Sequence, residues 1–287
     1  MRLCYHQRMR PLSLLALLLV ACVAPAAAET RAPAAAAESA AQDPLVDARR
    51  LYNLGEYDAA QAAAHRAIEV PHLANGALVV LGRIQLERYR KSGASADLAD
   101  AREALRQVDA RALDERERLE WSIGVAETLY FEDRFGAAAE LLEPLIESST
   151  VLGFAAHERL LDWWATSMDR QARARPPADR LPVYERIEKR MMEELGLDPG
   201  SSPAGYWLAA AARGRGDVER AYQVAMAGWL RAPQARDRGA ALRADLDRLV
   251  VQAIIPERIA RLAVRDQTQA LAGMLGEWEA FKVSWSR

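Results

Sequence analysis

A short pattern that recurs along the chain constrains its fold more than any other feature. Residues 48–60 and 126–138 share, in the same order and spacing, a small residue, a Leu, a Tyr, a turn residue, an aromatic residue and two Ala. Residues 209–221 follow the same order more loosely, with Gly216-Asp217 at the turn. Because Gly and Asp tolerate the backbone of a tight turn, each copy predicts two helices joined in this way. Repetition of such a unit predicts a chain of helix pairs.

Five small residues mark the first helix of five expected pairs, where each would let a second helix approach closely. They are Ala48, Gly82, Ala126, Ala165 and Ala209, separated by 34, 44, 39 and 44 residues. With the aromatic residue after the turn and Pro233 closing the fifth unit, the pattern resembles the tetratricopeptide repeat. Only the first separation equals the period of that family, so the later units carry insertions or belong to a looser relative.

The resemblance covers about residues 43–233 and implies an α/α superhelical solenoid of about five helix pairs. Strand signals are nearly absent, and the abundant Ala, Leu, Arg and Glu favour helix, so we expect an all-α protein. Beyond the repeats, two apolar stripes separated by Pro256, which we expect to break the helix, predict capping helices over 237–287. The stripes consist of Leu242, Leu246, Leu249, Val250, Ala253 and Ile254, and of Leu271, Met274, Leu275, Trp278, Phe281 and Trp285.

Two units depart from the pattern. The second has a Ser-Gly-Ala-Ser loop at 92–95, and the fourth has a long Pro-containing loop at 171–178 before a second helix at 181–195. Trp163 and Trp164 in the fourth unit are adjacent and therefore point to different faces of a helix. One of them should lie in the core, while the other either anchors a partner or packs against the 171–178 loop.

The N-terminus predicts export. Arg2, Arg8 and Arg10 precede a short apolar run, and no acid occurs in residues 1–21, which is typical of a secretory signal and too short to span a bilayer. Two cleavage sites compete: residues 19–22 resemble a lipobox that would place lipid on Cys22, and the three Ala ending at Ala28 suit ordinary signal peptidase. We favour lipidation, because Cys22 would be the only cysteine left after cleavage.

The segment that follows, 22–42, is rich in Ala and lacks large apolar residues, which predicts a disordered tether before the repeat domain at 43–236. Val23 is not the Asp that commonly retains lipoproteins at the inner membrane. The expected location is therefore the periplasm, with a lipid anchor in the outer membrane. A soluble periplasmic or secreted protein is the alternative.

The charge balance argues against several partners. The whole chain has a net charge of −2, and removal of the signal leaves 35 basic and 40 acidic groups, a net of −5. Nucleic-acid binding usually needs a basic excess, so no nucleic acid is expected. The same balance argues against a basic membrane patch, so membrane contact is expected only through the lipid anchor.

No chemistry-bearing motif is complete. The sequence His157-Glu158 begins a zinc-binding HExxH motif, but position 161 is Leu, and the histidines are scattered. Gly214-Arg215-Gly216 lacks the third glycine of a dinucleotide-binding loop. We therefore expect no catalytic residue, no metal, no cofactor and no enzyme activity.

The resemblance implies a binding surface on the first helix of each pair, where family members hold peptides or protein segments in a concave groove. A peptide or protein partner is therefore expected, and the chain would act as a non-catalytic adaptor of the bacterial envelope. Two other functions stay open: an enzyme or accessory protein acting on envelope glycan with 171–178 as a lid, and a structural subunit that self-assembles through its C-terminal helix. The expected partner-binding residues are Arg49, Tyr52, Asn53, Arg83, Glu87, Glu127, Tyr130, Asp162, Asp169 and Tyr206.

Overall fold

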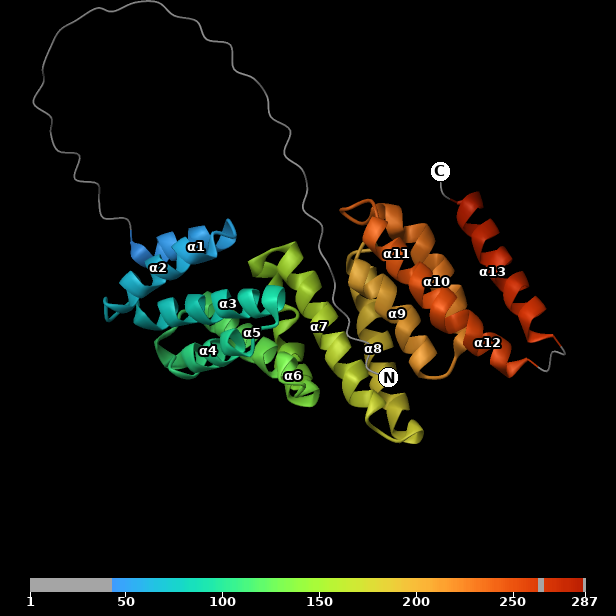
Figure 1. The fold of residues 1–287 in the computed structure, drawn as a ribbon, viewed down its shortest axis with the longest axis horizontal. Coiled ribbons are helices and arrows are strands. Elements are labelled where there is room, and N and C mark those ends of the chain that lie inside the picture. Colours follow the sequence, from blue (N-terminus) through green and yellow to red (C-terminus); the bar gives the residue numbers. More distant parts are fainter. Residues whose placement is uncertain (1–42, 263–265, 286–287) are drawn as a thin grey trace, which may run out of the picture. The chain divides into compact units, whose positions relative to one another are not determined.

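The structure is a computed structural model and describes residues 43–262 and 266–285. Within these ranges the chain is all-α, without a strand, and Figure 1 shows its helices following one another in chain order. The α-helices are α1 (Pro44–Asn53), α2 (Tyr57–Ile68), α3 (Ala74–Ser92), α4 (Ser95–Arg106), α5 (Glu115–Phe131), α6 (Phe135–Leu142), α7 (Phe154–Arg173), α8 (Pro177–Leu197), α9 (Ser202–Gly214), α10 (Val218–Arg231), α11 (Ala240–Leu249), α12 (Ile255–Arg261) and α13 (Gln267–Ser284).

Local sequence signals set where several helices begin. The Asp43 carboxylate accepts the backbone N–H of Leu45 at 2.8 Å, and Pro44 occupies the first turn of α1, where its missing N–H costs nothing. Helix α5 opens with a capping box in which Asp114 and Glu117 bind each other's backbone N–H. These caps satisfy N–H groups that have no partner within the helix.

The turns at 55, 133 and 216 are built alike, as the repeated sequence pattern predicts. Gly55, Asp133 and Gly216 all adopt positive φ, at 78°, 59° and 87°. In each turn the backbone N–H of the following residue donates a hydrogen bond to the carbonyl five residues before it, at 2.9–3.0 Å. This hydrogen bond belongs to a common motif that ends helices and requires a residue in the left-handed conformation. The same hydrogen-bonded turn therefore joins α1 to α2, α5 to α6 and α9 to α10.

The small residues that the sequence singles out lie where helices approach each other. Ala48, Ala126, Ala165 and Ala209 have no exposed surface. Gly82 in α3 faces α4 so closely that a Cβ atom there would lie 2.6 Å from Cγ of the buried Leu105. The backbone of α3 therefore approaches α4 only because position 82 has no side chain.

Gly82→Ala is expected to destabilise the fold by about 1–3 kcal/mol, because Leu105 must leave its packed position. Gly276→Ala is the matched control, since its added Cβ would meet nothing within 4 Å in α13. There the better helix propensity of Ala should raise stability by up to about 1 kcal/mol. Urea unfolding of the two variants measures the difference, and equal effects of the two would contradict this account of α3 packing.

The helices pack mainly on their neighbours in sequence, and the first helix of each pair also touches the next first helix. Thus α1 contacts α3, α3 contacts α5, α5 contacts α7, α7 contacts α9 and α9 contacts α11. The buried apolar side chains accordingly form successive clusters. One spans α1 to α3, another α5 to α9, and a third α9 to α13. The core of residues 43–285 is distributed along the sequence.

Two expectations about the later units are wrong. The loop expected at 171–178 is only three residues long, because α7 continues to Arg173 and α8 begins at Pro177. Pro256 does not end the helical path, since a π-helical turn at Val250–Ile254 leads directly into α12 with Pro256 in its first turn. The wider hydrogen-bond spacing of the π turn accommodates the N–H that proline lacks.

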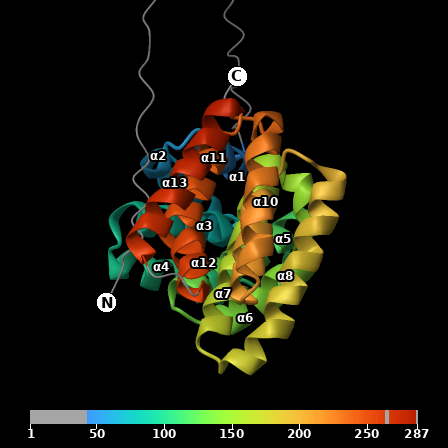
Figure 2. The same cartoon turned by 90° about the vertical axis from the view of Figure 1, so that its right-hand side faces the viewer.

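The C-terminal helix α13 lies at the end of the described chain, on the near side in Figure 2. Trp278 from the second predicted stripe is fully buried against α10, whereas Trp285 is 57% exposed and outside the core. Of these two members of the stripe, only Trp278 therefore contributes to the core. The signal at 1–21, Cys22 and the tether at 22–42 lie outside the described residues. None of the described helices is long and apolar enough to cross a membrane.

Candidate functional site

Side chains of the first helices converge over α5. Arg90 of α3 lies 5.2 Å from the ring of Trp163 on α7, and Arg159 of α7 lies 3.4 Å from the Glu87 carboxylate on α3. Both pairs bridge α3 and α7, the two helices that flank α5. Arg49 of α1 likewise reaches Glu117 of α5 at 2.5 Å, past α3. The three bridges indicate one shared face lined by α1, α3, α5 and α7, which we call the inner face.

Two Arg–Glu pairs of equal spacing form the centre of this face. Arg83 binds Glu120 at 2.9 Å, and Arg90 binds Glu127 and, at 2.9 Å, Glu87. Arg90 follows Arg83 by seven residues on α3, and Glu127 follows Glu120 by seven residues on α5. Seven residues make about two helical turns, so the two arginines share the side of α3 that faces α5, and the two glutamates share the side of α5 that faces α3. We call Arg83, Glu87, Arg90, Glu120 and Glu127 the charged cluster.

Aromatic rings cover the charged cluster at both ends. Tyr52 of α1 lies under the Arg83 guanidinium at 4.4 Å and donates a hydrogen bond to Glu87 at 3.4 Å. At the other end Trp163 contacts Arg90 and lies 6.4 Å from the ring of Tyr130 on α5. A hollow of about 280 Å³ opens beside Tyr52 and is lined also by Arg49 and the exposed Asn53. Aromatic and Arg side chains are the types that dominate protein-binding surfaces.

Tyr52 gives this face a testable pH signature. Burial raises the pKa of Tyr52 to about 12, with Arg83 opposing the shift and the Glu87 carboxylate adding to it. Because the folded-state pKa exceeds the unfolded value of 10.0, Tyr52 contributes stability that is complete below pH 10 and lost as the pH rises towards 12. The free energy of unfolding should therefore fall less steeply over that interval in Tyr52→Phe than in wild type. Urea unfolding at several alkaline pH values checks this, and parallel curves would contradict it.

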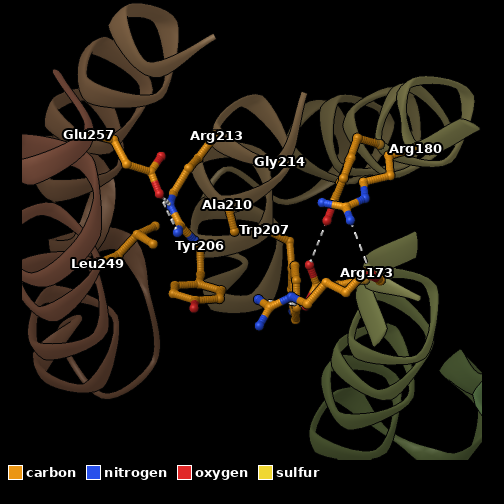
Figure 3. Close-up of a pocket in the computed structure, with 11 residues that line it drawn as sticks. Arg173, Arg180, Tyr206, Trp207, Ala210, Arg213, Gly214, Leu249 and Glu257 are labelled. Carbon is orange, nitrogen blue, oxygen red and sulfur yellow. Dashed lines mark hydrogen bonds and ion pairs between the residues drawn. The ribbon is translucent and has the colours of Figure 1, made fainter. Parts of the chain in front are cut away.

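A second cavity, of about 340 Å³, lies between α7, α8, α9 and α12 (Figure 3). Tyr206 and Trp207 of α9 line it, with their ring centroids 5.3 Å apart. Arg213 binds Glu257 at 2.5 Å on one side, and Arg173 and Arg180 stand on the other. We call this cavity the α9 pocket.

The acids of the α9 pocket are already engaged. Asp169 accepts the Tyr184 hydroxyl at 3.0 Å and the Arg173 guanidinium at 2.8 Å, while Glu257 is held by Arg213. Buried acids beside aromatic rings are the arrangement expected of a protein that acts on glycan. Here each carboxylate is held in an ion pair with an arginine, an arrangement that suits a structural role.

The ten predicted residues therefore fall into groups. Five of them, Tyr52, Arg83, Glu87, Glu127 and Tyr130, meet in or beside the charged cluster, and Arg49 and Asn53 line the adjoining hollow. Asp169 and Tyr206 line the α9 pocket, and Asp162 lies at its edge, where it accepts the Trp207 N–H at 2.7 Å. Glu127 and Asp169 are only 6% exposed, because Arg ion pairs hold them between helices.

The structure also assembles a Ser–His–Glu group that the sequence did not reveal. The ring of His157 lies 2.8 Å from the Ser149 hydroxyl through Nδ1 and 2.8 Å from Glu194 through Nε2. Ser149 has no exposed surface and donates its proton to the carbonyl of Ile146 at 2.6 Å. A nucleophile must reach its substrate, so this buried group instead ties α7 to α8.

Sequence reasoning missed Arg90, Glu120, Arg159 and Trp207 as members of these sites. The seven-residue spacing from Arg83 to Arg90 and from Glu120 to Glu127 was a usable signal, because it places both pairs on one face of each helix. Arg159 and Trp207 had no such signal, since their partners lie on other helices. In the described ranges, no group of three or more His, Cys, Asp or Glu side chains is placed to hold a metal ion.

No protein-family model matches this chain, and a search of the curated proteins gives no match. The structure defines the protein as an all-helical chain, whose described part repeats one hydrogen-bonded turn between paired helices. Its surface features are an inner face of paired charges and aromatic rings, and the α9 pocket.

Proposed function

We propose that this protein is a non-catalytic scaffold of the bacterial cell envelope that binds a peptide or a protein segment along its inner face. In this proposal the helix pairs form a solenoid similar to tetratricopeptide proteins, with the inner face as its concave groove. A lipid on Cys22 and the segment 22–42 attach it to the periplasmic side of the outer membrane. The single observation that carries the proposal is the convergence of Arg90, Trp163, Arg159 and Glu87 over α5.

The convergence supports binding for a physical reason. Residues that only stabilise a helical stack bury apolar groups between neighbouring helices, whereas this face orders Arg, Tyr and Trp side chains at a partly open surface. Their mutual ion pairs hold them in place before any partner arrives, which lowers the entropy that binding must offset. The mixture of signs suits a polypeptide better than a polyanion.

Site-specific photo-crosslinking tests the proposal in cells. A photoreactive amino acid would replace Asn53 or Arg159, which are exposed on the inner face, or Asp100 of α4 or Gln223 of α10 as exposed controls. Discrete adducts are expected from the first two positions and none from the controls. Adducts equally frequent at all four positions, or confined to the controls, would refute inner-face binding.

Two further measurements test the remaining parts of the proposal. The mass of the mature N-terminus should show a lipid-modified Cys22, and an unmodified start at Glu29 would refute the anchor. Size measurement over a range of concentrations should give a monomer. Growth with concentration would instead favour the self-assembling subunit.

A further inference from the structure

Most carboxylates on the first helices are neutralised within the chain. Glu87 pairs with Arg90 at 2.9 Å, and Glu120 pairs with Arg83 at the same distance. Glu127 is bound by Arg90, and Asp169 is bound by Arg173 at 2.8 Å. These ion pairs leave few negative charges on the first helices without an arginine partner.

Asp162 of α7 is different. It is exposed, and no Arg or Lys of the described ranges forms an ion pair with it. Within the described ranges its one side-chain hydrogen bond comes from the indole N–H of Trp207, which reaches Oδ1 at 2.7 Å. A carboxylate offers about four acceptor sites, so Asp162 can accept further donors beside Trp207. Glu158, one turn earlier, accepts the backbone N–H of Ser202 at 3.1 Å and interacts with the positive charge of Arg236.

The surroundings of Asp162 favour a positive charge. Although exposed, the side chain is crowded by neighbouring helices, and this loss of solvation raises the pKa of its carboxyl, with the negative charge of Asp245 on α11 adding to the shift. Tyr130 of α5 is near enough that the charge of Asp162 contributes to raising the pKa of its hydroxyl, after burial. The charged neighbour that acts on Asp162 is thus acidic, and a cation placed there is attracted by both carboxylates.

We propose that Asp162 binds an Arg or Lys side chain of the partner segment, beside Trp207. The inference rests on the proposed function and names the chemistry of the partner. The negative charge and the further acceptor sites of Asp162 both fit a guanidinium or ammonium group. A metal ion fits less well, because Asp162 belongs to no group of three or more His, Cys, Asp or Glu side chains in the described chain.

A display library of short random peptides, selected on the purified protein, tests the inference whatever the identity of the partner. Peptides that bind wild type should be enriched in Arg or Lys at one position. Their affinity should fall about tenfold or more in Asp162→Asn, because one charge-assisted contact is lost. Asn keeps an acceptor oxygen for Trp207, so the fold should be unchanged. Asp100→Asn, which removes the same charge from an exposed position of α4, should bind as wild type does.

The outcomes separate this inference from the proposed function. Selected peptides without a common basic position, or with equal affinity for Asp162→Asn, would overturn the role of Asp162 and leave inner-face binding intact. Enrichment of acidic residues would instead point to the arginines of the α9 pocket and would also overturn it. Failure to select any peptide, together with the absence of inner-face crosslinks in cells, would refute both.

Discussion

Trp164→Ala should lower the free energy of unfolding by about 3–5 kcal/mol, which is the usual cost of removing a large buried aromatic side chain. Trp164 is fully buried in the cluster that joins α5 to α9, so its removal leaves a cavity among several helices. Its indole nitrogen finds no hydrogen-bond partner among the residues that the structure describes. Trp164→Phe should therefore cost much less, since it keeps most of the ring and loses no hydrogen bond. Urea unfolding followed by circular dichroism measures both.

The adjacent Trp163 provides the control for this prediction. Its ring is only partly buried and contacts Arg90 and Tyr130 on the inner face. Trp163→Ala should cost about 1 kcal/mol in stability, while reducing partner crosslinking from the inner face. Equal losses of stability in Trp163→Ala and Trp164→Ala would show that the two tryptophans are not divided between surface and core.

Trp278→Ala should cause the second large loss, again about 3–5 kcal/mol. Trp278 has no exposed surface, stacks on Phe281 at 5.4 Å and meets Trp229 of α10 at 5.5 Å. Its indole N–H also donates to Asp247 of α11 at 2.8 Å. It is the only fully buried side chain among the described residues of α13. In Trp278→Ala, hydrogen exchange should show that the backbone amides of α13 lose protection before those of α3 and α5.

Trp285→Ala is the comparison for Trp278→Ala within the same region. Trp285 is 57% exposed, so its removal should change stability by no more than about 0.5 kcal/mol. If Trp285→Ala also released α13, the docking of this helix would depend on contacts other than Trp278. Limited proteolysis of the two variants distinguishes these results.

The sequence predicted the parts of the fold that depend on local chemistry. The turns at Gly55, Asp133 and Gly216 and the buried small residues from Ala48 to Ala209 follow from patterns within a few positions, and the all-α class follows from composition and spacing. The extent of α7 was mispredicted because Gln171 to Arg173 continue the helix, and only the three residues before Pro177 are non-helical. Proline constrains the residue before it, but earlier residues stay free to be helical.

The candidate site was less predictable, because it depends on how helices are rotated against each other. The position of Glu87 on α3 could be inferred, but its contact with Arg159 joins side chains 72 residues apart. His157 and Glu194 likewise meet only once α7 and α8 have packed. The sequence spacing around each of these residues does not indicate which residue of another helix it contacts. The sequence therefore identified some of the residues of the candidate site, but not which of them form pairs.

The arrangement of the core as successive clusters has a mechanical consequence. The cluster of α1 to α3 has no member among the helices from α9 to α13, so the two ends can lose structure separately. A force applied between the two ends of the described chain would unfold the helix pairs one after another. Single-molecule stretching should then give a series of small steps in place of one cooperative rupture.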